Sequence, residues 1–600
     1  MFSERYSKAV KEISFFSPGL LIISLALILI TGQDFCFSQS GPDRGNHSEF
    51  YGGKYNNSPL GENVFIFDPS MDMNEIQTVI DTLFARQSKR SSEFSSNRYA
   101  LLFKKGTYYL DVKVDYYMQV LGLGDSPDDV VIEGAVRSNT THGNSVLTNF
   151  WRSVENLTVI PKVNSTMVWG VSQAAPLRRV HIKGNLQLFD KGYASGGFLA
   201  DSKIDGTINS GPQQQWFTRN TEFGNWEGGN WNMMFMGVPQ APDENWPEKP
   251  YTTIEKTPLI REKPYLACDE KGFKIKIPEI RKETTGNGWS GGIENEKTIR
   301  IDKFYIVRPE TDNSATINKA LTEGKYLLFT PGKYFLGQSL KVTKAGTVIM
   351  GTGLSTLIPE NGTAAMEISD VDGVMICGLT IDAGKTFSEK LFVVGEPGSH
   401  KSHSKNPLFL YDIFFRVGGP TEGSAKMCME INSSDVYVDH TWIWRADHGN
   451  GVGWEKNRCA NGLIVNGDNV TIYGLFNEHF QEYQTIWNGN NGRVYFYQSE
   501  MPYDPPTTES WKHDGVNGYA SYKVSAAVKS HEAWGIGIYN VFYDAPVIVD
   551  NAIETPLNLE KKIHHKIIFW LNGNKESVVR SIINGKGGAV NVSNRKATMD

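Results

Sequence analysis

The chain has 600 residues, of which 40% are hydrophobic, 12% aromatic and 21% charged, and its formal net charge is −6. This composition is typical of a folded globular protein, and the length favours two or more large units over a single core. A mild negative charge without a basic patch argues against nucleic acid as a partner.

The N-terminus has the pattern of a secretory signal. Lys8 and Lys11 precede the apolar run GLLIISLALILI at residues 19–30, and small residues follow this run. The run is short for a membrane span, and an uncleaved anchor is the alternative. We expect residues 1–40 to be a signal peptide or anchor and residues 41–62 to be a flexible segment. The protein is then secreted, without stable membrane association unless the anchor is retained.

Two stretches of the chain repeat each other and indicate two similar units. LLFKKGTYYL at residues 101–110 returns as LLFTPGKYFL at residues 327–336, and each copy follows a helical pattern and precedes a glycine turn. We therefore expect units at residues 63–300 and 301–600. The stretch 246–292 is rich in Pro, Lys, Glu and Gly, which predicts a long loop.

Within each unit, short alternating runs break at Asp or Asn turns. The same pattern recurs, with variations, in MEISDVDGVMICGLTID from Met366, MEINSSDVYVDHTWIW from Met429 and LIVNGDNVTIYGLF from Leu463. Irregular repeats of this kind are typical of a right-handed parallel β-helix, whose coils stack inward Val, Ile and Leu. The expected fold is all-β, with two tandem β-helices, a capping α-helix at the start of each and a cleft between them. A pair of β-sandwiches or a propeller is the alternative.

The sequence gives no support for a cofactor or a metal. Cys268, Cys377, Cys428 and Cys459 are widely spaced and form no CxxC pattern; one or two disulfides are conceivable, but the sequence cannot pair them. No P-loop, nucleophile elbow or HExxH motif occurs. We therefore expect no cofactor and no metal.

A single carboxylate attracts attention in FYQSEMPYDPP, residues 496–506. A strand-like run ends at Glu500, which is followed by Met501, Tyr503 and three prolines. Rigid apolar surroundings favour the neutral form of a carboxyl group, which general-acid catalysis requires. A solvated loop glutamate is the ordinary alternative.

Five segments, spread over both halves, carry recognisable motifs: WGVSQAAPLRRV (169–180), YASGGFLADSKIDG (193–206), QQQWFTRNTEF (213–223), EHFQEYQ (478–484) and QSEMPYDPP (498–506). In sequence and in order they resemble the motifs of glycoside hydrolase family 55, a family of secreted β-1,3-glucanases built from two tandem β-helices. Between these motifs the similarity is thin. Ser499, Met501 and the Asp504-Pro505-Pro506 ending depart from the family pattern, so another linkage or sugar is conceivable.

The resemblance implies a function and assigns roles to three residues. It places Glu500 at the position of the general acid, and Gln173 and Ser195 at the positions that hold the attacking water. Inversion at the anomeric carbon is then expected. Neither an amide nor a hydroxyl is a competent base near neutral pH, so Asp201, Glu478 and Glu482 are candidates for a missed base. The expected substrate is a polysaccharide, with β-1,3-glucan favoured, and the expected state is a monomer.

Other residues are predicted to bind sugar. WRADHGNGVGW (444–454) sets an aspartate and a histidine among glycines before a tryptophan that could stack on a sugar ring, although a structured turn explains it equally well. A lone histidine is weak support for a metal. The predicted substrate-binding residues are Asp447, His448, Trp454, Glu478, His479, Tyr503, His531 and Trp534.

Two other classes of function stay open at this stage. Polysaccharide lyases and epimerases also occur on β-helices, but they usually need clustered aspartates and a basic cleft, which the sequence does not indicate. A non-catalytic glycan-binding or adhesion protein would use the β-helix as a stalk, and Glu500 would then be freely replaceable.

Overall fold

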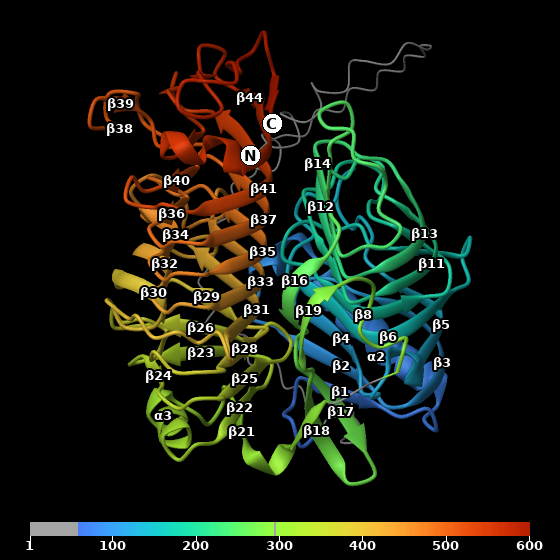
Figure 1. The fold of residues 1–600 in the computed structure, drawn as a ribbon. Helices are drawn as coiled ribbons and strands as arrows, with labels where there is room; N and C mark the ends of the chain where they lie inside the picture. Colours follow the sequence, from blue (N-terminus) through green and yellow to red (C-terminus); the bar gives the residue numbers. More distant parts are fainter. Residues whose placement is uncertain (1–57, 293–295) are drawn as a thin grey trace, which may run out of the picture.

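The computed structural model describes residues 58–292 and 296–600. It consists of two stacks of parallel β-coils that stand side by side (Figure 1). The predicted signal or anchor, and residues 41–57 of the predicted flexible segment, lie outside the described residues. Among the residues that are described, no helix has both the length and the apolar character needed to cross a membrane.

The first stack is one branched sheet of parallel strands. Its strands are β1 (Val64–Phe67), β2 (Tyr99–Phe103), β3 (Gly106–Lys113), β4 (Met118–Gly122), β5 (Val130–Arg137), β6 (Arg152–Pro161), β7 (Thr166–Val168), β8 (Leu177–Ile182), β9 (Asn185–Gln187), β10 (Phe198–Ala200), β11 (Lys203–Asn209), β12 (Gln215–Arg219), β13 (Glu222–Glu227), β14 (Asn232–Met236) and β15 (Tyr251–Ile254).

The second stack has two main sheets, one on each side of its core. The sheet nearer the first stack contains β21 (Phe304–Val307), β22 (Tyr326–Phe329), β23 (Lys333–Leu336), β25 (Val348–Gly351), β26 (Thr356–Pro359), β28 (Met375–Cys377), β29 (Thr380–Asp382), β31 (Leu408–Val417), β33 (Val436–Arg445), β35 (Thr471–Glu478), β37 (Gly492–Glu500), β41 (His531–Phe542), β44 (Ile563–Gly573) and β46 (Lys596–Met599). The outer sheet contains β24 (Leu340–Val342), β27 (Met366–Ile368), β30 (Ser388–Val394), β32 (Ala425–Ile431), β34 (Asn461–Val465), β36 (Thr485–Trp487), β40 (Tyr522–Val524) and β43 (Ile553–Glu554).

Short elements complete the described chain. These are the two-residue strands β38 (Lys512–His513), β39 (Val516–Asn517), β42 (Ile548–Val549) and β45 (Val578–Val579), and the 3₁₀ helices η3 (Arg90–Phe94), η4 (Pro127–Asp129), η5 (Ile301–Lys303) and η6 (Leu557–Lys562).

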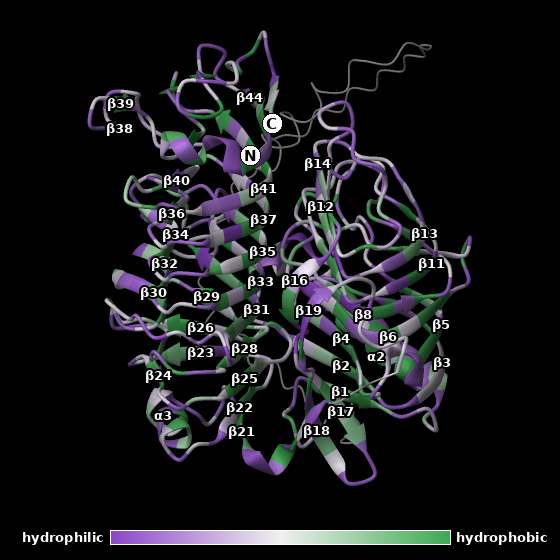
Figure 2. Ribbon diagram, viewed as in Figure 1, coloured by the Kyte–Doolittle hydropathy of each residue, from purple (hydrophilic) through white to green (hydrophobic). Residues whose placement is uncertain are grey.

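Each stack is held together by ladders of apolar side chains. In the first, Leu101, Val120, Val154, Leu177 and Leu199 are successive register partners from β2 to β10, and all are fully buried. A comparable ladder runs from Ile376 on β28 to Ile563 on β44 in the second stack. Hydrophobic residues lie along the strands and hydrophilic ones gather on the outer turns (Figure 2). Stacked coils bury apolar area that a single coil would expose.

An α-helix covers the open end of each stack, as expected. In the first unit, α2 (Met73–Gln87) begins at Asp72, whose carboxylate accepts hydrogen bonds from two backbone N–H groups of the first turn. In the second, α3 (Ser314–Thr322) begins at Asn313, which forms a capping box with Thr316. Both helices bury one apolar face against the first coils, which hides strand edges from solvent.

The prediction that residues 246–292 form a loop is wrong. This region and the chain up to Arg300 form antiparallel pairs between β16 (Thr257–Arg261) and β19 (Ile280–Thr284), and among β17 (Tyr265–Asp269), β18 (Gly272–Ile277) and β20 (Lys297–Arg300). Ile260, Leu266 and Ile275 are buried, which gives the strands an apolar face despite the polar composition. In Figure 1, β16 and β19 lie between the two stacks.

The two stacks pack through a column of left-handed bends. His440 on β33 has φ +72°, Gly474 on β35 has φ +74° and Phe496 on β37 has φ +70°. The His440 ring stacks 4.6 Å from that of Phe198, and the Phe496 ring stacks 5.7 Å from that of Phe217. Because the bends turn these side chains out of their own core, the second unit can press directly on strands β10 and β12 of the first.

Candidate active site

A pocket of about 280 Å³ opens where the two units meet, at the carboxyl ends of neighbouring strands of the second unit. Glu478 ends β35 and Glu500 ends β37. The pocket is lined by Arg90, Glu93, Phe94, Leu147, Thr148, Phe150, Gln173, Trp442, Trp444, Asp447, His448, Gly449, Glu478, His479, Glu500 and Tyr503. This volume lies near the lower end of the range for small-ligand sites.

Glu500 is buried and set among aromatic residues. The hydroxyl of Tyr503 donates a hydrogen bond to its Oε2, and the backbone N–H of His479 donates to its backbone carbonyl (2.9 Å). Tyr539, its register partner on β41, is buried, and this burial raises the pKa of the phenol, with the charge of Glu500 adding to the effect. The apolar surroundings predicted for Glu500 are therefore present on the neighbouring strand as well as in the loop.

Glu478 is a second buried carboxylate in the same pocket. Its Oε1 accepts hydrogen bonds from Nε2 of Gln173 (2.9 Å) and Nε2 of Gln498 (2.6 Å), and its Oε2 accepts one from Nε1 of Trp442 (2.7 Å). Burial raises the pKa of Glu478 to about 7, and the charge of Asp447 adds to this, although the three N–H donors lower it. Such a group changes its charge near neutral pH.

Gln173 is the polar residue of the first unit that contacts Glu478. It precedes β8, and its backbone adopts φ +32°, a sparsely populated conformation for a residue with a side chain. Besides Glu478, its Nε2 contacts Oγ of Ser195 (3.3 Å), which also accepts a hydrogen bond from Nε2 of Gln215 (3.0 Å). Ser195 does not line the pocket: it lies behind Gln173. Its predicted contact with the attacking water is therefore not visible in this geometry.

Asp447 and His448 line the pocket as predicted, together with Glu93 from η3 of the first unit. Nε2 of His448 lies 2.5 Å from Oε1 of Glu93, and Nδ1 lies 3.0 Å from Oδ1 of Asp447. Although burial lowers it, the pKa of His448 is raised well above its ordinary value by the two carboxylates. The resulting imidazolium links the two units at the pocket wall.

Aromatic rings form the apolar wall. The indole of Trp442 packs 4.7 Å from the ring of Phe150 and 4.8 Å from that of Trp444. Trp454 lies in an adjoining hollow that shares Asp447, His479 and Tyr503 with the main pocket. Trp442, Trp444 and Phe150 are buried, whereas Trp454 is partly exposed, so Trp454 is the ring best placed among these to stack on a sugar.

His479 also lines the pocket, but it does not orient Glu478. Its Nδ1 lies 3.3 Å from the carbonyl of Met501, and its ring meets Tyr503 edge to face at 4.4 Å. Burial lowers the pKa of His479 to about 4, so the ring is neutral near pH 7. It supports the loop after Glu500.

The prediction that His531 and Trp534 belong to this cleft is wrong. His531 pairs with Gly492 and Trp534 with Tyr495, whereas Glu500 pairs with Tyr539. At roughly 3.3 Å per residue, His531 lies about 26 Å along the strand from the level of Glu500. The coils are in register, but His531 and Trp534 lie near the start of β41, whereas Tyr539, the partner of Glu500, lies toward its end. Trp534 instead stacks on the ring of Tyr495 at 4.5 Å in an aromatic ladder.

Two further candidates for a base lie elsewhere. Asp201 is bound by Arg179 (3.3 Å) and by the backbone N–H of Gly288, and Glu482 is partly exposed on a turn. Neither lines the pocket. Of the three carboxylates considered from sequence, Glu478 alone lies there.

Sequence reasoning missed several pocket residues. Glu93 and Phe150 belong to the first unit and stand in stretches without any motif. Trp442 and Trp444 carried a usable signal, because alternation in Thr441-Trp442-Ile443-Trp444 places both indoles on one face of a strand. Within the described residues, no group of histidine, cysteine or acidic side chains could hold a metal ion, and all four cysteines are free thiols.

Comparisons with known proteins agree with this architecture. Residues 304–500 match the family model described as the LAM55 pectate lyase-like domain. The chain is 45% identical over 520 residues to an exo-β-1,3-glucanase of Streptomyces sp. (strain SirexAA-E / ActE), an alignment that covers 86% of this chain and 85% of that protein.

Two solved structures from the same source are similar over nearly their whole length. SacteLam55A from Streptomyces sp. SirexAA-E has a TM-score of 0.87 and 42% identity, covering 90% of this chain and 98% of that one. A variant of that protein in which one glutamate is replaced by alanine, in complex with glucose, has a TM-score of 0.87 and 41% identity, covering 91% of this chain and 98% of that one.

Proposed function

Since this chain belongs to glycoside hydrolase family 55, we propose that it hydrolyses β-1,3-glucan from a chain end. The observation that carries the proposal is the pocket at the junction of the units, which Glu500, Glu478 and Gln173 all line. Most glycoside hydrolases use a pair of carboxyl groups beside the scissile bond, one of them as the general acid. The Streptomyces relative, an exo-β-1,3-glucanase, supports both the linkage and the mode of attack.

In this mechanism Glu500 is the general acid. Its proton goes to the glycosidic oxygen as the bond to the anomeric carbon breaks, so that the leaving sugar departs as a neutral alcohol. Burial beside Tyr503 and Met501 supports the protonated form before reaction, because a low dielectric disfavours charge.

Water attacks the anomeric carbon from the opposite face, with inversion. Gln173 supports this step because it lines the pocket and contacts Glu478. Glu478 accepts the proton that the water loses, and its pKa of about 7 suits a base that works near neutral pH. Ser195 contributes by holding the Gln173 amide in place.

The test is a reducing-sugar assay over soluble and insoluble glucans, with wild type and Glu500→Gln compared. We expect release of glucose from β-1,3-glucan and a loss of about 10²–10⁴-fold in kcat for the variant, while glucose binding is retained. NMR of the first product should show α-glucose. Undiminished activity of Glu500→Gln would remove Glu500 from the acid role, β-glucose would contradict inversion, and an unsaturated product would indicate a lyase.

We also propose that the protein is secreted and acts as a monomer. The charged and apolar pattern of residues 1–40 supports export, and both halves of the pocket come from one chain. N-terminal sequencing of protein recovered from the culture medium tests cleavage near residue 40, and light scattering tests the monomer. Cell-bound protein that keeps residues 1–40 would contradict cleavage, and a defined dimer would contradict the monomer.

A further inference from the structure

A cluster of buried charges joins the two units below the pocket. The second unit provides Asp412 on β31 and Asp439 on β33, and the first provides Arg178 on β8 and Arg219 on β12. Charged side chains are seldom fully buried unless they are paired. Here the pairing runs between the units, so the cluster determines how they sit against each other.

Arg178 is the residue that bridges both aspartates. Its Nε and Nη2 donate to the two carboxylate oxygens of Asp412 (2.9 and 2.8 Å). Its Nη1 donates to Oδ2 of Asp439 (2.7 Å), and its Nη2 also donates to the backbone carbonyl of Asp439 (2.9 Å). A planar guanidinium fork can make this set of bonds, and an ammonium group cannot.

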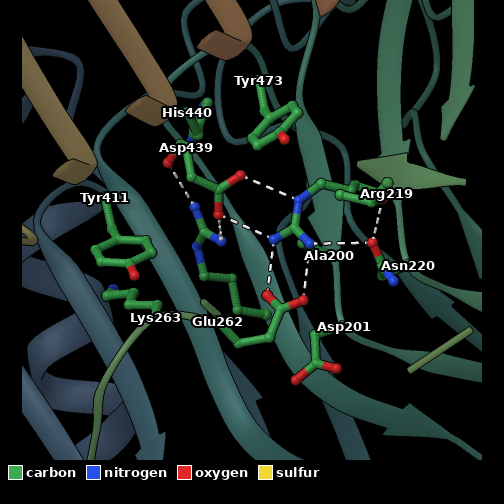
Figure 3. A network of polar contacts seen from close by, with 12 residues as sticks. Ala200, Asp201, Arg219, Asn220, Glu262, Lys263, Tyr411, Asp439, His440 and Tyr473 are labelled. Carbon is green, nitrogen blue, oxygen red and sulfur yellow. Dashed lines mark hydrogen bonds and ion pairs between the residues drawn. The ribbon is translucent and has the colours of Figure 1, made fainter. Parts of the chain in front are cut away.

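Asp439 and Asp412 each bind a second cation besides Arg178. Figure 3 shows Arg219 between Asp439 and Glu262, and both carboxylates bind it in a bidentate manner. Lys263 lies 3.0 Å from Asp412. Glu262 and Lys263 come from the chain just after β16, so the segment between the units takes part in joining them.

Short lengths of chain connect this cluster to the pocket on both sides. Gln173 precedes Arg178 by five residues in the first unit, and Trp442 follows Asp439 by three residues in the second. Gln173 and Trp442 both donate hydrogen bonds to Glu478. Two of the three groups that donate to Glu478 are thus connected, through a few residues each, to the buried ion pairs.

We propose that Arg178 is a positioning residue for the hydrolysis: by binding Asp412 and Asp439 it sets Gln173 of the first unit against Glu478 of the second. This inference rests on the proposed function. A shift of about 1 Å in a catalytic constellation can cost on the order of 100-fold in rate. A loosened junction between the units is a direct way to produce such a shift.

The test uses Arg178→Lys and Asp439→Asn in the full chain. Arg178→Lys keeps the charge, but its three N–H donors cannot replace the four hydrogen bonds that Arg178 makes to Asp412 and Asp439, and Asp439→Asn keeps the shape. Asp370→Asn is the control, because Asp370 is a buried aspartate bound by His403 (2.8 Å) and Ser433 (2.7 Å) within the second unit. At a temperature well below each variant's Tm, we expect kcat on laminari-oligosaccharides to fall about 10–100-fold in both test variants, with KM nearly unchanged, and to stay near wild type in the control.

A double-mutant cycle separates positioning from a merely structural role. If Arg178 acts through Gln173, then Arg178→Lys combined with Gln173→Ala loses no more kcat than Gln173→Ala alone. Arg178→Lys and Gln173→Ala should each also move the acidic limb of the kcat/KM profile to higher pH. The Gln173 amide lowers the pKa of Glu478, and each change takes that amide away from the carboxylate. Should Arg178→Lys not fold, the isosteric Asp439→Asn takes its place in the same cycle.

The outcomes are distinct. Additive losses in the cycle, an unmoved pH limb, or a control that falls as far as the test variants would each overturn the inference. Wild type that releases no sugar from β-1,3-glucan would refute the proposed function itself, and that result is read before any variant is compared.

Discussion

Replacing Trp442 by phenylalanine perturbs one hydrogen bond of the pocket and little else. The indole Nε1 donates to Oε2 of Glu478 at 2.7 Å, while the rings of Phe150 and Trp444 pack against its faces. Phenylalanine keeps most of the ring packing and removes the N–H. Trp442→Phe is therefore a test of how the pocket controls the charge of Glu478.

The size of the effect follows from the geometry. A buried hydrogen bond to a charged group contributes about 1.5–3 kcal/mol. Each pKa unit corresponds to about 1.4 kcal/mol, so loss of this donor should raise the pKa of Glu478, already about 7, by roughly 1–2 units. If ionised Glu478 is the base, the acidic limb of the kcat/KM profile moves to higher pH by the same amount.

The assay is kcat/KM on a laminari-oligosaccharide as a function of pH, with Trp444→Phe as the matched control. Trp444 belongs to the same wall, and within the described chain its indole makes no hydrogen bond to Glu478. We expect the limb to move in Trp442→Phe alone. A limb that stays in place, or one that moves equally in the control, would refute the assignment of that limb to Glu478.

Two further variants test the junction of the units. Gly474→Ala should destabilise the fold by about 1–3 kcal/mol in denaturant unfolding, because φ is +74° and the new Cβ would lie 3.1 Å from Phe217. Gly515→Ala is the control for backbone strain alone, since Gly515 has φ +82° and no neighbour within 4 Å of the new Cβ. An equal loss of stability in Gly515→Ala would contradict a role for the contact with Phe217. His448→Gln should lower the free energy of unfolding mainly at acidic and neutral pH. Because the pKa of His448 is raised in the folded state, its ion pairs stabilise the fold fully below about pH 6.5 and lose that contribution as pH rises through the folded-state pKa. A difference in stability between variant and wild type that does not narrow in alkaline solution would contradict this account.

Much of the architecture was predictable because it depends on short-range patterns. Stacked coils need alternating apolar residues and turns, and both are readable in segments such as the one from Met429. The place of Glu500 at a strand end was predictable for a similar reason, since a strand, an acid and a row of prolines are adjacent in the chain, while its role as general acid stays a prediction. The antiparallel pairs among β16 to β20 were missed because their strands are short and rich in charge, and their apolar faces appear only when paired.

The errors at the site have one origin. His531 and Trp534 belong to the strand next to that of Glu500, and both were predicted to bind the substrate. Register decides otherwise, since Glu500 pairs with Tyr539. Position along a strand depends on which residue faces which across coils, and a motif carries no information about that.

Local sequence was sufficient for the coils, the capping helices and the position of Glu500 at a strand end, because each depends on neighbours within a few residues. The pocket depends on packing between units that are hundreds of residues apart. The packing of one stack against the other brings about three contacts: Glu93 with His448, Gln173 with Glu478, and Arg178 with two aspartates. The non-glycine bends at His440 and Phe496 allow that contact, and buried charge makes any other arrangement costly.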